Sequence, residues 1–161
     1  MSVLILTTGG TIDKLYFDAL SEYQIGESVV DRLLKTGRVA LPFRVHELLR
    51  KDSLELTDDD RALILRAILD ADETRIVITH GTDTMTDTAR VLAGRTDKTI
   101  VLVGALAPAR FAESDASFNL GMAFATAQVA GPGVWIAMNG TIFDGTKVRK
   151  DRSINSFVAA E

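Results

Sequence analysis

The sequence predicts an α/β fold, namely a three-layer α/β/α sandwich with a mostly parallel sheet and a C-terminal β-hairpin. Short apolar runs rich in β-branched residues alternate with stretches in which apolar side chains have helical spacing, and this alternation is typical of strand, helix and strand units. The apolar runs are nearly continuous, as in central parallel strands. Glycine or small polar residues follow several of them, where turns lead away from a sheet.

The first half of the chain contains three predicted strands and two predicted helices. The strands cover residues 3–7, 43–49 and 76–79. Residues 13–28 lack a sustained period, so we predict a long loop there, of a kind that often covers a functional site. The apolar face of the first helix comprises Val29, Val30, Leu33 and Leu34, and that of the second, which Thr57 caps, comprises Leu63, Ile64, Ala67, Ile68 and Ala71.

The second half continues the alternation. Thr84 has Asp87 three residues later, which is the spacing of a capping box, so a third helix is predicted to begin there. Further strands are predicted at residues 99–105 and 134–138, with a helix at 117–130 between them. The apolar residues on one side of that helix are Phe118, Met122 and Ala125.

The C-terminal end contains a strong hairpin signal. Asp144-Gly145 separates two short β-prone runs, and this dipeptide is favoured in tight hairpin turns. We therefore predict that residues 141–143 pair with residues 146–150. Residues 151–161 are predicted to form a tail or a linker.

Composition narrows the classes of function. The 161 residues suit one domain, and the 18 Lys and Arg against 22 Asp and Glu give a net charge of −4 without a basic cluster, so we expect no nucleic-acid partner. The absence of Cys excludes thiol nucleophiles, and two His make a metal site improbable. The N-terminus shows no targeting pattern and no apolar run approaches membrane-spanning length. We expect a cytoplasmic protein with no membrane partner.

Polar turns follow four of the predicted strands, at residues 9–11, 52–53, 82–83 and 104–105. If the strands are adjacent and parallel, these turns share one edge of the sheet and face one pocket. Hydroxyls, a carboxylate and backbone donors suit a small polar substrate. A Thr nucleophile needs a base and an oxyanion hole, and Lys150 is one candidate base. The alternative is that these are ordinary capped turns.

Two of these turns resemble the signature motifs of the bacterial-type L-asparaginases, which are amidohydrolases that release ammonia from L-asparagine and sometimes from L-glutamine. The motifs are residues 8–12, Thr-Gly-Gly-Thr-Ile, and residues 80–85, His-Gly-Thr-Asp-Thr-Met. Further stretches that agree with the family run from Asp52-Ser53 to Lys150, so the resemblance covers nearly the whole chain. It implies L-asparagine as the substrate, no cofactor and a homo-oligomer.

The resemblance also implies the catalytic residues. Thr11 would be the nucleophile that attacks the side-chain amide carbon. A Tyr on the following loop would lie close to it; Tyr23 fits the family pattern better, and Tyr16 remains an alternative. Thr82 would supply a second essential hydroxyl, and Lys150 would lower the pKa of Thr82.

The substrate-binding residues follow from the same resemblance. Asp83, which also counts among the catalytic residues, would hold the α-ammonium group of the substrate, and Ser53 would hold its α-carboxylate. The remaining binding positions, which include those that contribute backbone groups, would be Gly10, Asp52, Gly81 and Ala105.

The chain departs from the family in its extent. Family members are usually about twice as long and have a smaller C-terminal domain that completes the active site of a neighbouring subunit. We therefore expect residues 1–161 to be a single N-terminal domain without that second domain. Leu56 and Thr146 replace a Met and an Arg that are common in the family. The alternatives are a weakly active or non-catalytic amino-acid-binding module and an ammonia-supplying subunit of an amidotransferase.

Overall fold

A six-stranded sheet forms the centre of the protein, and it is mostly parallel, as predicted. The structure is a computed structural model that describes residues 1–17, 22–26 and 28–161. The strand order is β4-β1-β5-β6-β7-β8; the first five strands are parallel, and β8 is antiparallel to β7. The strands are β1 (Val3–Gly9), β4 (Phe43–Lys51), β5 (Arg75–Thr79), β6 (Thr99–Val103), β7 (Gly133–Met138) and β8 (Thr141–Asp144).

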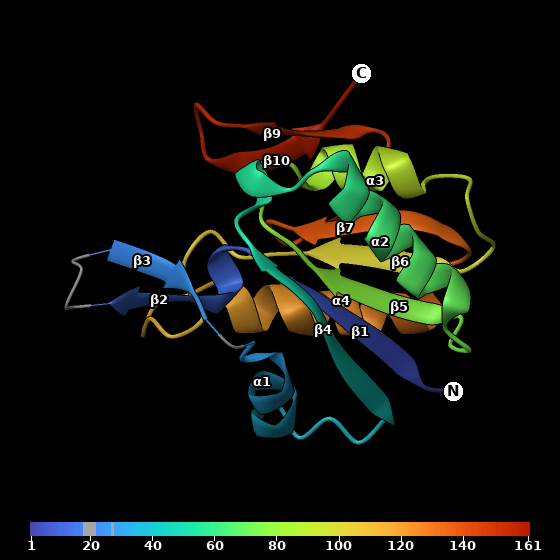
Figure 1. The fold of residues 1–161 in the computed structure, drawn as a ribbon, viewed down its shortest axis with the longest axis horizontal. Helices are drawn as coiled ribbons and strands as arrows, with labels where there is room; N and C mark the ends of the chain where they lie inside the picture. Colours follow the sequence, from blue (N-terminus) through green and yellow to red (C-terminus); the bar gives the residue numbers. More distant parts are fainter. Residues whose placement is uncertain (18–21, 27) are drawn as a thin grey trace.

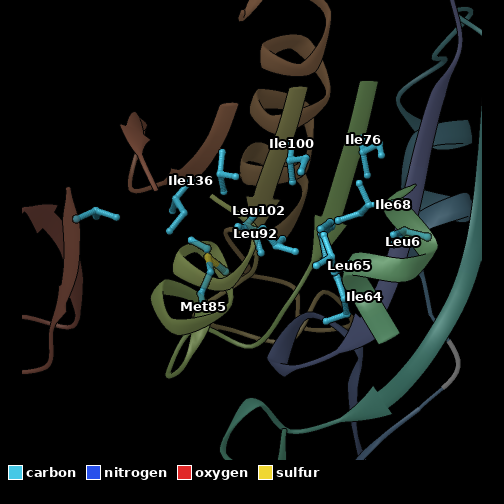
Figure 2. Packing of buried hydrophobic residues seen from close by; sticks show 14 of the residues in the cluster. Leu6, Ile64, Leu65, Ile68, Ile76, Met85, Leu92, Ile100, Leu102 and Ile136 are labelled. Carbon is cyan, nitrogen blue, oxygen red and sulfur yellow. The ribbon is translucent and has the colours of Figure 1, made fainter. Parts of the chain in front are cut away.

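Helices cover both faces of this sheet and complete the predicted three layers (Figure 1). One face packs against α2 (Asp58–Asp70), α3 (Met85–Leu92) and the hairpin of β9 (Val148–Asp151) and β10 (Ser156–Ala159). The other packs against α1 (Val30–Thr36) and α4 (Ala116–Val129). Strand side chains alternate between the two faces. Figure 2 shows the first core, where Ile76 and Ile100 of the sheet face Ile68 and Leu92 of the helices.

The order of the strands creates a switch point at β1. The chain passes from β1 to β4 on one side, and β5, β6 and β7 then extend the sheet from the other side of β1. In open α/β sheets, ligands bind at the carboxyl ends of the strands where the order reverses. This places the expected site at the ends of β1 and β5.

One crossover has the opposite hand to the other three. Helices α2 and α3 lie on one face, and each connects two strands in the direction from β4 towards β7. Helix α1 lies on the other face and connects β1 to β4 in the reverse direction. Reversing both the face and the direction keeps the hand, so these three crossovers have the same hand. Helix α4 connects β6 to β7 in the forward direction on the face of α1. Because such crossovers are right-handed in about 98% of cases, β6-α4-β7 is the exception.

The predicted long loop is a hairpin. Strands β2 (Lys14–Phe17) and β3 (Glu22–Ile25) pair antiparallel, with Tyr16 opposite Tyr23. The loop prediction for residues 13–28 was therefore wrong for the two strands, and its positions 18–21 and 27 lie outside the described residues. In Figure 1 this hairpin extends to one side of the sheet. Its side chains at residues 22–24 are exposed, so no hydrophobic pattern marked it.

The C-terminal hairpin exists, but it lies elsewhere than predicted. Strand β8 pairs with β7 through the turn Asn139-Gly140, whose φ angles are 53° and 66°. Strand β9 pairs with β10, which lies in the region predicted as a tail. Gly145 does not join a hairpin: its N–H donates to the Val134 carbonyl at 2.8 Å, which holds the end of β8 against β7.

Two helix faces also differ from prediction. In α2, Leu63 is 41% exposed, while Arg61 and Leu65 are buried. In α4, Phe118 and Ala125 face outward, and the buried residues are Ala116, Asn119, Leu120, Ala123, Phe124, Thr126 and Ala127. Within the part of the chain that the structure describes, no helix combines the length and hydropathy needed to cross a membrane.

Candidate active site

The turn after β1 is built around two glycines with positive φ. Gly9 has φ 100° and Gly10 has φ 84°, a region that residues with a Cβ rarely adopt. The Gly10 N–H donates to the Lys51 carbonyl of β4 at 2.9 Å. This turn delivers Thr11, which is half-buried, to the start of a one-turn 3-10 helix over Thr11–Asp13.

The turns after β1 and β5 touch through their backbones. A Cβ on Gly10 would lie 2.5 Å from the Gly81 nitrogen and 2.6 Å from its Cα, far inside van der Waals contact. Position 10 therefore requires glycine. The contact brings the segment that carries Thr11 beside the segment that carries Thr82.

Thr82, Asp83 and Lys150 form a cluster at the end of β5. Lys150 Nζ donates to Thr82 Oγ1 at 2.8 Å and to Asp83 Oδ1 at 3.0 Å. The Thr82 residue is 6% exposed, and the side chains of Lys150 and Asp83 are 13% and 33% exposed. Arg152 adds a longer ion pair with Asp83 Oδ1 at 3.6 Å. The hairpin of β9 and β10 thus brings a cation to the sheet edge.

Ser53 and Asp52 lie next to this cluster, at the end of β4. Ser53 is 1% exposed, and a Cβ on Gly81 would lie 2.6 Å from both Cβ and Oγ of Ser53. Asp52 accepts from the Leu54 N–H and pairs with Lys14 at 3.2 Å. Although burial acts to raise the pKa of Asp52, the Leu54 N–H and the Lys14 ammonium hold it below its ordinary value.

Ala105 packs beneath the Thr11 segment. It is 1% exposed and belongs to a small apolar cluster with Ile12 and Ala116. The Ala109 N–H donates to the Ile12 carbonyl at 3.1 Å. The connection between β6 and α4 is therefore tied to the residue that follows Thr11.

Asp13 anchors the root of the hairpin. It is 1% exposed, its Oδ1 accepts from the Val29 N–H at 3.0 Å, and its carbonyl accepts from Gly26 and Arg110, each at 2.9 Å. Burial raises the pKa of Asp13 to about 6, against the lowering effects of the Val29 N–H, Ser28 and Arg110. Sequence reasoning did not single out this carboxyl.

Tyr23 lies on the outer part of the hairpin. It is 53% exposed, and its ring meets that of Phe111 at 6.1 Å between centroids. It also lines an open pocket of about 360 Å³ together with Lys14, Gln24, Ile25, Arg50, Asp52 and Glu55. The backbone of Tyr16 is opposite, but its side chain lies outside the described residues. The choice between the two tyrosines therefore stays open.

His80 was missed by sequence reasoning and is fully buried. Its Nδ1 faces the Gly81 carbonyl at 2.6 Å and its Nε2 faces Thr88 Oγ1 at 2.7 Å. Because a carbonyl only accepts, Nδ1 carries the proton and Nε2 accepts from Thr88. Burial lowers the pKa of His80 to about 4, so the ring is neutral at pH 7. Its position directly after an apolar strand was the available signal.

Among the described residues, no three His, Asp or Glu side chains gather as a metal site.

Comparison with known proteins identifies the family of the chain. The family model "Asparaginase, N-terminal" matches residues 2–159. The chain belongs to the asparaginase family.

Individual asparaginases agree with this assignment. The chain is 35% identical over 164 residues to L-asparaginase 2 of Escherichia coli (strain K12), covering 92% of this chain and 46% of that protein. It is 32% identical to a glutaminase-asparaginase of Acinetobacter glutaminasificans, covering 96% of this chain and 51% of that protein. The structure of the thermostable L-asparaginase from Thermococcus kodakarensis matches with TM-score 0.86 and 30% identity, covering 99% of this chain and 51% of that chain.

The chain thus spans about half the length of the asparaginases it matches. The matched half is the N-terminal domain. The site described above lies within this half, and the roles that the family resemblance predicts for its residues remain predictions. The structure places Gly10, Ser53, Gly81, Thr82, Asp83 and Lys150 in one connected group.

Proposed function

We propose that this chain hydrolyses L-asparagine to L-aspartate and ammonia through Thr11 as the nucleophile. The observation that carries the proposal is the hydrogen bond from Lys150 to Thr82, which joins residues 68 positions apart at the sheet edge where the Thr11 turn also lies. The Lys150 side chain is partly buried, at 13% exposed, and it donates to both a hydroxyl and a carboxylate. Removing a charge from water in this way is costly unless the charge is paired, which supports a functional role for the arrangement.

In the proposed first step, Thr11 Oγ adds to the side-chain amide carbon of L-asparagine. The C–N bond then breaks, the hydroxyl proton leaves with the amide nitrogen as ammonia, and an aspartyl ester of Thr11 remains. Backbone N–H groups in the glycine turns would stabilise the negative charge that develops on the carbonyl oxygen.

In the second step, water adds to the ester and releases L-aspartate. Thr82 Oγ1 takes a proton from the water as it attacks and passes its own hydroxyl proton to the amine of Lys150, whose Nζ lies 2.8 Å away. The proton later returns along the same path to Thr11 Oγ when the ester breaks. Asp83 would hold the α-ammonium group of the substrate, and Ser53 its α-carboxylate.

The test is ammonia release from L-asparagine and, separately, from L-glutamine. Thr11→Val is expected to lower kcat by at least about a thousandfold with little change in melting temperature, because it removes the hydroxyl and keeps the shape. Thr126→Val is the matched control: this buried hydroxyl donates to the Met122 carbonyl within α4, so its loss should leave turnover intact. Wild-type rates from Thr11→Val would exclude the assignment.

A second candidate function is ammonia supply to a partner protein. The chain is 42% identical over 84 residues to a component of the glutamyl-tRNA(Gln) amidotransferase of Methanococcus vannielii, which covers 47% of this chain and 20% of that protein. Under this alternative, ammonia release would require a co-purifying partner. Ammonia release by the purified chain alone favours the hydrolase. Thermal stabilisation by L-aspartate without turnover favours a binding module.

We also propose that the protein is a homo-oligomer in the cytoplasm. The family resemblance supports the oligomer, since its members complete the site with a neighbouring subunit. Light scattering during size-exclusion chromatography measures the mass directly, and a monomer at all concentrations would exclude this part of the proposal.

A further inference from the structure

The hydroxyl of Thr84 lies where it would cap helix α3, yet it bonds elsewhere. Thr84 is the N-cap residue of α3 but makes no side-chain hydrogen bond to the helix. Its Oγ1 donates instead to the Ser53 carbonyl at 2.8 Å. A side-chain cap stabilises a helix by about 1 kcal/mol. The capping box predicted from the spacing of Thr84 and Asp87 is therefore absent at this helix end. The Thr84 hydroxyl instead links two turns of the candidate site.

The backbone of Thr84 makes a second bond to the same residue. The Thr84 N–H donates to Ser53 Oγ at 3.3 Å. A hydroxyl has one donor and two acceptor positions. Because Thr84 occupies an acceptor position, the proton of Ser53 can be directed at another acceptor. An anionic oxygen such as that of a carboxylate suits a buried hydroxyl donor of this kind.

Ser53 also contacts the other end of the same turn. Gly81 packs so closely on Ser53 that a Cβ there would lie 2.6 Å from its Oγ. Residues 81 and 84 thus both contact Ser53, and the dipeptide between them is Thr82-Asp83. The position of Ser53 and the position of that dipeptide are therefore set together by packing at one end and by two hydrogen bonds at the other.

We propose that Thr84 is a positioning residue for substrate binding: its hydroxyl fixes the backbone of Ser53 so that the Ser53 hydroxyl donates to the α-carboxylate of the substrate. This inference rests on the proposed function, because it takes an α-amino acid as the ligand. Thr84 itself does not touch the substrate. Its effect passes through Ser53 and appears in affinity rather than in the chemical step.

The test compares Thr84→Val with Thr84→Ser. Loss of the hydroxyl in Thr84→Val should raise the KM for L-asparagine about five- to tenfold and change kcat by less than about threefold, because a uniform binding contact is weakened. Thr84→Ser keeps a donor and should stay within about twofold of wild type in both. Thr84→Ala replaces Thr84→Val if the latter does not fold. Thr126→Val, which also removes a hydroxyl donating to a carbonyl at 2.7 Å, should leave KM unchanged.

A double mutant separates action through Ser53 from a general structural effect. Ser53→Ala removes the hydroxyl that Thr84 is proposed to position, so adding Thr84→Val to it should raise KM no further. Additive effects would overturn the inference. So would an unchanged KM in Thr84→Val, or a loss confined to kcat.

Failure of the proposed function has a different signature. If the wild type releases no ammonia, the hydrolase proposal fails, and the same set of variants is compared by calorimetric titration with L-aspartate. A five- to tenfold higher Kd for Thr84→Val, with recovery in Thr84→Ser, would then support the positioning role alone. A wild type that neither turns over L-asparagine nor binds L-aspartate would overturn both proposals.

Discussion

The two sides of the candidate site are held in different ways. The side that carries Thr82 and Asp83 follows β5 in the middle of the sheet, and the buried Ser53 and His80 and the partly buried Lys150 contact it directly. The side that carries Thr11 leads at once into the β2-β3 hairpin, whose second strand is mostly exposed. The position of Thr82 and Asp83 is therefore fixed by contacts with the centre of the fold. The position of Thr11 depends instead on the first residues of a peripheral hairpin.

This difference indicates where the site tolerates change. Substitutions on the core side should alter activity without loosening the fold, because several contacts hold each residue. Substitutions in the β2-β3 hairpin should have smaller effects on turnover than substitutions on the core side. Four substitutions test this contrast.

Lys150→Met should have the largest effect on activity. It removes the donor to both Thr82 and Asp83 while keeping a side chain of similar length, and we expect kcat to fall by about a thousandfold or more. The exposed Arg152 is the control, since its ion pair with Asp83 is longer, at 3.6 Å, and Arg152→Met should cost less than about tenfold. An unaltered rate and pH profile in Lys150→Met would contradict the proposed role.

Gly10→Ala should break the contact between the two sides. The new Cβ would lie 2.5 Å from the Gly81 nitrogen at a φ of 84°, so strain and overpacking together should cost about 4 kcal/mol of unfolding free energy. Gly94→Ala is the matched control, because Gly94 has φ 70° and would have nothing within 4 Å of its Cβ. It should cost about 1 to 2 kcal/mol. Equal losses in urea unfolding would mean that the backbone contact is unimportant.

How far the sequence predicts such features depends on their range along the chain. The strand ends and the glycine turns are local patterns, and the structure places them at one sheet edge. The link from Thr84 to Ser53 spans 31 positions and the link from Lys150 to Thr82 spans 68. No local pattern encodes those contacts. Residue chemistry made Lys150 one candidate base among several, only the family resemblance paired it with Thr82, and the Thr84 bond was missed.

The wrong predictions have physical causes of the same kind. Asp144-Gly145 has the composition of a hairpin turn, but Gly145 serves the close approach to Val134. In α4 most residues are apolar and they are not confined to one face, so periodicity could not distinguish the buried Phe124 from the exposed Phe118. In both cases tertiary packing, which the local sequence does not show, decided the outcome.

Asp13→Asn, at the root of the hairpin, should change how the free energy of unfolding depends on pH. The pKa of Asp13 is raised from 3.8 to about 6. Its contribution to the free energy of unfolding of the wild type is therefore fully present below about pH 4 and is lost as the pH rises to about 6. The loss amounts to about 3 kcal/mol. Asn keeps the oxygen that accepts from Val29 and cannot ionise.

The measurement is the difference in unfolding free energy between Asp13→Asn and wild type at pH 4.5 and pH 7.5. The variant should gain about 2 kcal/mol relative to wild type across this interval, because about 1 kcal/mol of the wild-type loss has already occurred at pH 4.5. His80, whose pKa of about 4 acts in the opposite direction by favouring the fold at higher pH, is present in both proteins and cancels. Arg110 and Glu47, the charges that face Asp13, are likewise unchanged. A difference independent of pH would contradict the raised pKa.

Tyr23→Phe should have the smallest effect. The side chain is 53% exposed and keeps its ring contact with Phe111 after the hydroxyl is removed, so unfolding free energy should change by less than about 0.5 kcal/mol. If the Tyr23 hydroxyl lies near Thr11 when substrate binds, kcat should fall by up to about tenfold. Tyr16→Phe is the paired control, because Tyr16 is opposite Tyr23 in the hairpin. A larger loss of kcat in Tyr16→Phe would assign the site to the first strand of the hairpin instead, and equal wild-type rates in both would remove the hairpin hydroxyls from the chemistry.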